Sequence, residues 1–253
     1  MNDYSIKDLE LAGVQWEITD VPAVMRAKWA ANTAPMPESQ TTDVRAGITV
    51  VPPIAPTATM SVDTAESMAS RPADVENLIR MICEFNHPLR AAATKVVLPN
   101  IAKNPNGLVI ITDVPSADDD SSGNVLSGSA GDLLDKMLAA IGMNRDIVSI
   151  IPIIFWRTPG GRTPTENELS LARPFVKRLI GFLNPRMILT LGATPALDIA
   201  GVKLSSNHGK IAKTQQDTPV MSIYHPNYLL LKPSAKREVW TALQELQNLL
   251  KNQ

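Results

Sequence analysis

The sequence predicts an α/β protein, a three-layer α/β/α sandwich around a central four-stranded parallel sheet. Four runs of strand length are apolar throughout, and segments with helical spacing of apolar residues separate them. Strands that are apolar on both faces are typical of parallel sheets whose two faces are covered by helices. The chain of 253 residues is long enough for one such domain and an additional segment.

The predicted elements begin with a helix over residues 72–83, which opens with Pro72 at a position where a helix tolerates proline. A helix over 166–183 has Thr165 as its N-cap, and Glu168 completes a capping box. The other expected elements are strands over 108–111, 147–155, 187–191 and 219–223 and helices over 130–141, 194–200 and 234–250.

We assign the folded domain to residues 65–253 and expect two segments ahead of it. Residues 1–30 carry Trp16 and Trp29 among spaced apolar residues, which predicts a short helical or anchoring segment. Residues 31–64 are rich in Pro, Ala and Thr, a composition typical of a linker. Residues 1–60 are therefore a candidate attachment for a protein partner.

Charge and composition exclude several classes of protein. A formal net charge of -1 excludes a uniformly basic nucleic-acid binder, although a local basic cluster can still attract DNA. The first residues carry charges and no apolar core, and no segment is long enough to span a bilayer, so we expect no membrane partner. The expected location is cytoplasmic, and nucleoid-associated if the chain is bacterial.

Three blocks place polar side chains where predicted strands end. Residues 224–230, after the last strand, read Tyr-His-Pro-Asn-Tyr-Leu-Leu and put His225 at the carboxyl edge of the sheet, where open α/β folds build their sites. Residues 112–120, after the first strand, read Thr-Asp-Val-Pro-Ser-Ala-Asp-Asp-Asp and include Asp113. Residues 155–165 form a Gly/Pro-rich turn that carries Arg157 and Arg162.

These blocks resemble motifs of the uracil-DNA glycosylase superfamily in its family 4 form. The first resembles His-Pro-Ser-Tyr-Leu-Leu, the second Gly-Glu-Ala-Pro-Gly-x-x-Glu-Asp, and the third the Arg-Pro-Pro-Gly-Asn-Arg-Thr-Pro loop. The resemblance spans roughly residues 89 to the last predicted helix. It implies a DNA glycosylase of base-excision repair, with DNA as the partner.

The resemblance implies catalytic roles for Asp113 and His225. Asp113 takes the place of the carboxylate that orients the attacking water and offsets positive charge on the sugar, and His225 takes the place of the donor near the departing base. From position alone, Asp113 could instead cap a turn or helix, and His225 could be satisfied within the edge of the domain.

The resemblance also implies a base pocket and a surface that faces DNA. The pocket residues are Thr112, Val114, Pro115, Leu126 and Pro152. The DNA-binding residues are Arg157 and Arg162, for phosphates, and Pro226, Asn227, Leu229 and Leu230, whose two leucines are candidate wedges beside a flipped nucleotide. The alternatives are surface salt bridges for the arginines and core packing for the leucines.

Some pocket positions depart from the family pattern. Pro152 stands where an asparagine reads the uracil edge, and proline offers neither an amide side chain nor a backbone N–H. Leu126 replaces the aromatic residue on which the base stacks, and Thr112 replaces a glycine that allows close approach. We therefore expect specificity for uracil to be altered or weakened.

The iron–sulfur cluster of family 4 needs four cysteines, whereas this chain has the single cysteine Cys83. His87 and Ala172 lie where cysteines are expected, and Trp156 occupies the place after the second strand. We expect no cluster, no other metal site and no further cofactor.

Two functions follow from the sequence. The first is a monofunctional DNA glycosylase that flips a deaminated or damaged base and hydrolyses its N-glycosidic bond. The second is a catalytically degenerate glycosylase fold that serves as a DNA- or protein-binding module. A nucleotide-binding Rossmann protein is disfavoured because no Gly-x-Gly-x-x-Gly follows the first strand.

Overall fold

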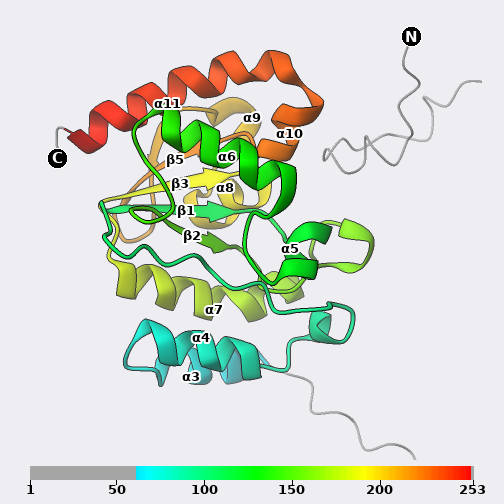
Figure 1. Cartoon of the computed structure of the whole chain (residues 1–253). Coiled ribbons are helices and arrows are strands. Elements are labelled where there is room, and N and C mark those ends of the chain that lie inside the picture. The colour runs from blue at the N-terminus through cyan, green and yellow to red at the C-terminus, as the bar shows by residue number, and fades with distance from the viewer. Residues whose placement is uncertain (1–60, 252–253) are drawn as a thin grey trace, which may run out of the picture. The chain divides into compact units, whose positions relative to one another are not determined.

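A computed structural model of the chain describes residues 61–251 (Figure 1). The predicted segment 1–30, the predicted linker as far as residue 60 and the proposed partner attachment lie outside these residues. The described region is an α/β fold with one mostly parallel sheet and helices on both of its faces. Within it, no helix combines the length and apolar character needed to cross a bilayer.

Five strands form the sheet in the order β2-β1-β3-β5-β4. The four predicted strands are parallel: β1 (Leu108–Thr112), β2 (Ser149–Pro152), β3 (Met187–Leu191) and β5 (Pro219–Ile223). The prediction of four strands was wrong by one, because β4 (Ile211–Lys213) pairs antiparallel with β5 at the edge. Since two of its three residues are exposed, β4 gives no continuous apolar run in the sequence.

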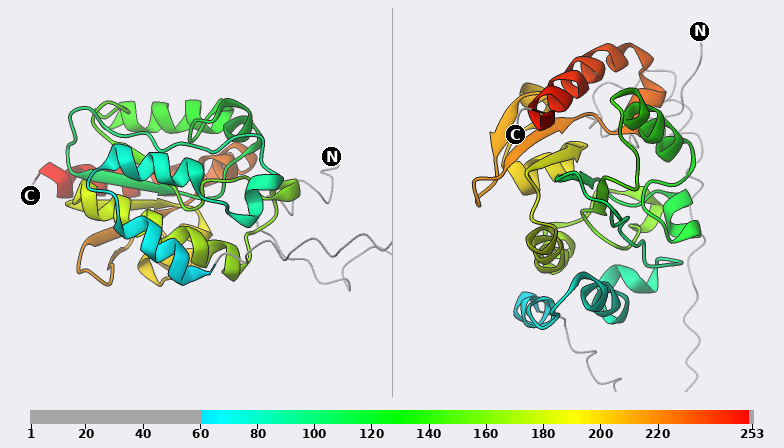
Figure 2. Two further views of the ribbon diagram at one scale, coloured as in Figure 1. Left: turned by 90° about the horizontal axis from the view of Figure 1, so that it is seen from below. Right: turned by 60° about the vertical axis from the view of Figure 1, so that its left-hand side comes forward.

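Alternate strand residues point to opposite faces of the sheet and build two separate cores. On one face, Leu108 and Ile110 pack with α6 (Gly128–Ala140) and α11 (Lys236–Lys251). On the other face, Val109 and Ile111 pack with α7 (Glu166–Leu183). Figure 2 shows α3 (Val62–Ser70) and α4 (Val75–Glu84) beyond α7, as an additional outer layer on that side.

Two elements with strong local signals were predicted with accurate boundaries. Helix α7 and strand β3 have the predicted bounds, and the Thr165–Glu168 capping box is present. The remaining elements are η2 (Pro88–Ala91), α5 (Ala117–Ser122), η3 (Pro159–Gly161), α8 (Ala193–Ala200), α9 (Leu204–Asn207), α10 (Pro226–Leu231) and η4 (Pro233–Ala235).

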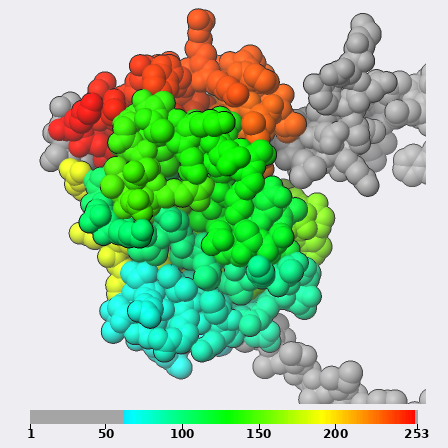
Figure 3. Space-filling model, viewed as in Figure 1, coloured from blue at the N-terminus to red at the C-terminus, as the bar shows by residue number. Residues whose placement is uncertain are grey.

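Two further segments differ from the prediction. Helix α3 begins at Val62, inside the predicted linker. The sequence did not indicate this helix, because it buries only the small side chains of Ala65 and Ala69 and so lacks a large apolar stripe. Residues 226–231, where no helix was predicted, form helix α10, with His225 as its N-cap and Pro226 in its first turn. Figure 3 shows the orange surface of α10 beside the green surface of α6.

Candidate active site at the carboxyl edge of the sheet

The ends of four parallel strands lie side by side at one edge of the sheet. Thr112, the last residue of β1, pairs with Pro152 at the end of β2 and with Leu191 at the end of β3. Leu191 in turn pairs with Ile223 at the end of β5. The residues that follow these strands, including Asp113 and His225, therefore occupy the same edge, as the sequence predicted.

His225 reaches across the end of β3 and contacts β1. Its Nε2 lies 3.0 Å from Oγ1 of Thr112. Its Nδ1 accepts a hydrogen bond of 3.2 Å from the backbone N–H of Asn227, which caps α10. Burial lowers the pKa of His225 to about 4, so the imidazole is neutral at pH 7.

Asp113, the residue after β1, is held by hydrogen bonds. Its Oδ1 accepts a hydrogen bond of 2.9 Å from the N–H of Val114. Burial raises the pKa of its carboxyl group, and hydrogen bonds from Val114 and from Thr194, in the first turn of α8, act in the opposite direction. The Asp113 carboxylate is thus partly desolvated and fixed in orientation, two properties that suit a base. It also contacts the first turn of α8, as a capping residue would.

Gly192 explains how the carboxylate fits at this edge. It follows β3 with φ 106° and ψ 174°, a conformation that is essentially restricted to glycine. A Cβ atom at this position would lie 2.6 Å from Oδ2 of Asp113. Sequence reasoning missed both Gly192 and Thr194, because only the pairing of β1 with β3 brings them to Asp113.

The predicted pocket residues are buried or half-buried. Thr112 is 3 % exposed, Pro115 and Pro152 are buried, and Val114 is half-buried. Leu126 is 3 % exposed and lies in the core shared with α6, in a left-handed conformation with φ 49°. Its side chain is therefore packed into the protein.

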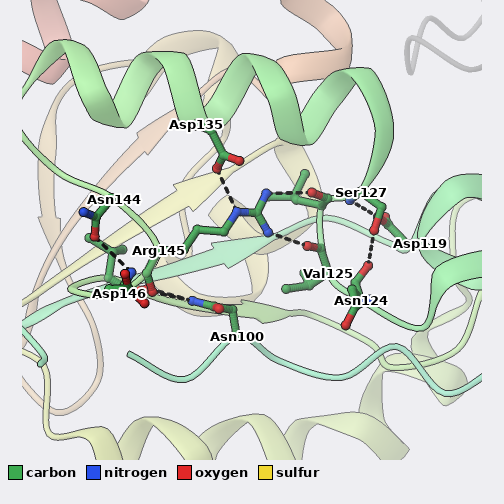
Figure 4. A network of polar contacts seen from close by, with 11 residues as sticks. Asn100, Asp119, Asn124, Val125, Ser127, Asp135, Asn144, Arg145 and Asp146 are labelled. Atoms are coloured by element: carbon green, nitrogen blue, oxygen red, sulfur yellow. Dashed lines mark hydrogen bonds and ion pairs between the residues drawn. The ribbon is translucent and has the colours of Figure 1, made fainter. Parts of the chain in front are cut away.

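A polar network fixes the backbone around Leu126 (Figure 4). The guanidinium of Arg145 donates to the carbonyl oxygens of Val125 and Leu126, at 3.0 and 2.7 Å, and its Nε donates to Asp135 of α6 at 2.7 Å. The N–H of Ser127 donates to Asp119 at 2.5 Å. These contacts hold the left-handed turn in place and leave it little freedom to expose the leucine.

Three cavities between the helices of the described region are lined by other residues than Asp113 and His225. The largest, about 670 Å³, lies between α7, α8 and the turn after β4, and shares only Thr194 with the surroundings of Asp113. The second, about 240 Å³, lies between α6, α10 and α11, and the third, about 500 Å³, between α3 and α7. None of the three is lined by Asp113 or His225.

The predicted DNA-facing residues differ in their surroundings. Arg162 makes a two-pronged ion pair with Glu168, at 2.8 and 2.6 Å, and this pair holds the pKa of Glu168 at about 2. Arg157 is half-buried, and its Nε is buried without a hydrogen-bond partner in the described region. The salt bridge that we gave as an alternative is thus present at Arg162.

The leucines of α10 differ in how exposed they are to solvent. Leu229 is 1 % exposed and belongs to the core, which is the alternative that we gave for it, whereas Leu230 is 41 % exposed. Leu231, which sequence reasoning did not select, is 50 % exposed. Pro226 is buried and Asn227 is exposed. Among these leucines, the exposed ones are the candidate wedges.

Comparison with known proteins identifies the family. A model of the uracil DNA glycosylase superfamily matches residues 99–247. The chain belongs to this superfamily. It is 31% identical over 155 residues to a type-4 uracil-DNA glycosylase of Pyrobaculum aerophilum, covering 57% of this chain and 78% of that protein. Over 150 residues it is 29% identical to the type-4 enzyme of Archaeoglobus fulgidus, covering 56% of this chain and 75% of the relative. It is 30% identical over 146 residues to the type-4 uracil-DNA glycosylase of Thermotoga maritima, covering 56% of this chain and 76% of that protein.

The residues of this superfamily member do not fit the iron–sulfur cluster that the family 4 resemblance implies. The ring of His87 stacks on Trp156, with centroids 4.5 Å apart and planes within 4°, and both residues are almost fully buried. Nε2 of His87 is bonded to the carbonyl oxygen of Glu168, at 3.0 Å, and Ala172 is fully buried in the same core. A cluster needs several thiolates and space, and packed rings supply neither.

Proposed function

We propose that this protein is a DNA glycosylase of base-excision repair that hydrolyses the N-glycosidic bond of an extruded, deaminated or damaged base. The observation that carries the proposal is the contact between His225 and Thr112, because it joins the histidine after β5 to the strand end that presents Asp113. Membership of the uracil DNA glycosylase superfamily supports a glycosylase-type function with DNA as the substrate.

The proposed reaction uses charge of opposite sign at the two ends of the breaking bond. The bond between C1′ of the sugar and the base nitrogen breaks, and its electron pair leaves with the base. Water forms the new bond to C1′, and one of its protons ends on the departed base. A carboxylate beside the sugar stabilises the positive charge that develops there, and a donor beside the base stabilises the negative charge.

Asp113 suits the sugar side of this reaction. Its carboxylate is fixed by Val114, and burial keeps the pKa of the carboxyl group above its ordinary value, so the group is a stronger base than an exposed aspartate. The neutral imidazole of His225 and the hydroxyl of Thr112, which are hydrogen-bonded to each other, suit the base side, since together they can supply a hydrogen-bond donor there. Leu230, exposed on α10, is the proposed wedge.

We propose that the base preference differs from that for uracil. Pro152 offers no donor or acceptor side chain at the position next to Thr112, and Leu126 offers no aromatic face. We also propose that the protein works without an iron–sulfur cluster, with the stacked rings of His87 and Trp156 filling that part of the core.

A base-release assay tests the proposal. The full chain is incubated with oligonucleotides that contain uracil, hypoxanthine or xanthine, beside the variants Asp113→Ala and His225→Ala. The proposal expects release of at least one base by the wild type and a loss of about 10²-fold or more in each variant. Equal background release by all three proteins rejects it.

A second candidate function is a binding module that recognises DNA or a protein partner without cutting. It is favoured by one observation, that Leu126, at the predicted stacking position, is 3 % exposed and packed into the core. Salt-dependent DNA affinity without base release supports this function, and no DNA affinity even at low salt leaves the protein partner. The proposed attachment for that partner is residues 1–60.

A further inference from the structure

The hydrogen bonds of His225 assign its proton to one nitrogen. Nδ1 faces the backbone N–H of Asn227 at 3.2 Å, and an N–H can only donate, so Nδ1 carries a lone pair. A neutral imidazole has a single N–H, which must therefore be on Nε2. Nε2 lies 3.0 Å from Oγ1 of Thr112, so His225 donates and the threonine hydroxyl accepts.

This bond uses the only proton that neutral His225 can donate. Thr112 is 3 % exposed and sits between the ends of β2 and β3, so its side chain has little room to move away. Its hydroxyl, having accepted a proton from the imidazole, still has its own hydrogen to donate. Among residues 61–251 no second partner of this hydroxyl is found.

We propose that Thr112 is a specificity-determining residue of the candidate site and that its hydroxyl, not the imidazole of His225, makes the hydrogen bond to the departing base. This assignment rests on the proposed function and deepens it. His225 becomes a positioning residue, which holds Oγ1 so that the hydroxyl hydrogen points outward. The base must then present an acceptor, such as a carbonyl oxygen or an unprotonated ring nitrogen, to the threonine.

The balance of protons in the reaction is unchanged by this arrangement. The hydroxyl stabilises the electron pair that leaves with the base by donating a hydrogen bond and keeps its own proton, while the proton that ends on the base comes from water.

The first arm of the test measures the hydrogen bond itself and needs no activity. The chain has three histidines, so the ring nitrogens and their protons can be assigned by NMR in the full-length protein. Thr112→Val keeps the shape of the side chain and removes the hydroxyl, whereas Thr112→Ser keeps the hydroxyl. Thr190→Val is the matched control, because Thr190 is a buried threonine of β3 whose hydroxyl donates to Ser222 at 2.7 Å.

The expected NMR result is a protonated Nε2 on His225 in the wild type, with a proton resonance that Thr112→Ser and Thr190→Val preserve. In Thr112→Val this resonance shifts or is lost through exchange with water. If His225 carries its proton on Nδ1, or if its Nε2 resonance is the same in Thr112→Val as in the wild type, the proposal is overturned.

The second arm measures base release from oligonucleotides with uracil, hypoxanthine or xanthine. On the base that the wild type releases fastest, Thr112→Val is expected to lose about tenfold in kcat/KM, the worth of one hydrogen bond, while Thr112→Ser and Thr190→Val stay within about twofold. Equal rates for Thr112→Val and the wild type overturn the assignment and leave the glycosylase function standing. If the wild type releases none of the three bases, the proposed function fails and the assignment fails with it.

Discussion

Replacing Gly192 by alanine tests how the edge of the sheet holds Asp113. The added Cβ would lie 2.6 Å from Oδ2 of Asp113 and 3.2 Å from both its Cβ and its Cγ. Because Val114 and Thr194 hold the carboxylate, it cannot turn away without losing hydrogen bonds. The backbone conformation costs an alanine about 1–3 kcal/mol and the crowding about 1–3 kcal/mol more, so we expect the free energy of unfolding to fall by about 2–6 kcal/mol.

Gly201→Ala is the matched control for this experiment. Gly201 ends the same helix, α8, with φ 66°, and a Cβ at this position would meet no atom within 4 Å. It should therefore cost only the left-handed conformation, about 1–2 kcal/mol. Urea denaturation followed by tryptophan fluorescence gives both values. Equal losses of stability in the two variants, or full base release by Gly192→Ala, would refute the reasoning.

Three further predictions concern pH, specificity and DNA. Burial lowers the pKa of His87, and that of His225 to about 4, so the unfolded chain binds more protons below its own histidine pKa of about 6.5. The free energy of unfolding should then fall as pH drops from about 6.5 toward 4. His225 contributes less than about 3 kcal/mol to this fall, because the residue is only half-buried and solvent screens its charge. Denaturant midpoints that are independent of pH in this window contradict this. Thr112→Gly removes the hydroxyl that is proposed to donate to the base and should lower release of the base that the wild type prefers by about tenfold, and an unchanged rate argues against this. Leu230→Ala should weaken binding to duplex DNA with a mismatched base while leaving stability nearly unchanged, because Leu230 is exposed. The buried Leu229, replaced by alanine, should instead cost about 2–5 kcal/mol of stability. The reverse pattern in binding and melting assays would exclude Leu230 as the wedge.

The parts of the fold that the sequence predicted are those with strong local signals. Strand β3 is a run of five buried residues, and α7 begins at a capping box, so both could be delimited from neighbouring residues alone. Strand β4 could not, because it is three residues long and is held at the edge only by pairing with β5. Helix α3 was missed since its buried residues are alanines.

The site was predictable only in part, for the same reason. The ends of buried strands placed Asp113 and His225 at one edge, but their partners depend on strand order. Thr112 and His225 are far apart in the chain, and they meet only because the strand order puts a single strand, β3, between β1 and β5. No local pattern marks Gly192 as a neighbour of Asp113. Burial of Leu229 likewise follows from the unexpected helix α10.

The account depends on Asp113 and Thr112 facing the sugar and the base of one extruded nucleotide. The most direct measurement is a crystal structure of the full chain with an oligonucleotide that carries the most readily released base on a 2′-fluoro sugar, which resists cleavage because fluorine disfavours positive charge on the sugar. The account predicts that the base is extruded, with an acceptor within about 3 Å of Oγ1 of Thr112 and C1′ beside the carboxylate of Asp113. A nucleotide that stays stacked in the DNA, or that binds away from this edge of the sheet, would contradict it.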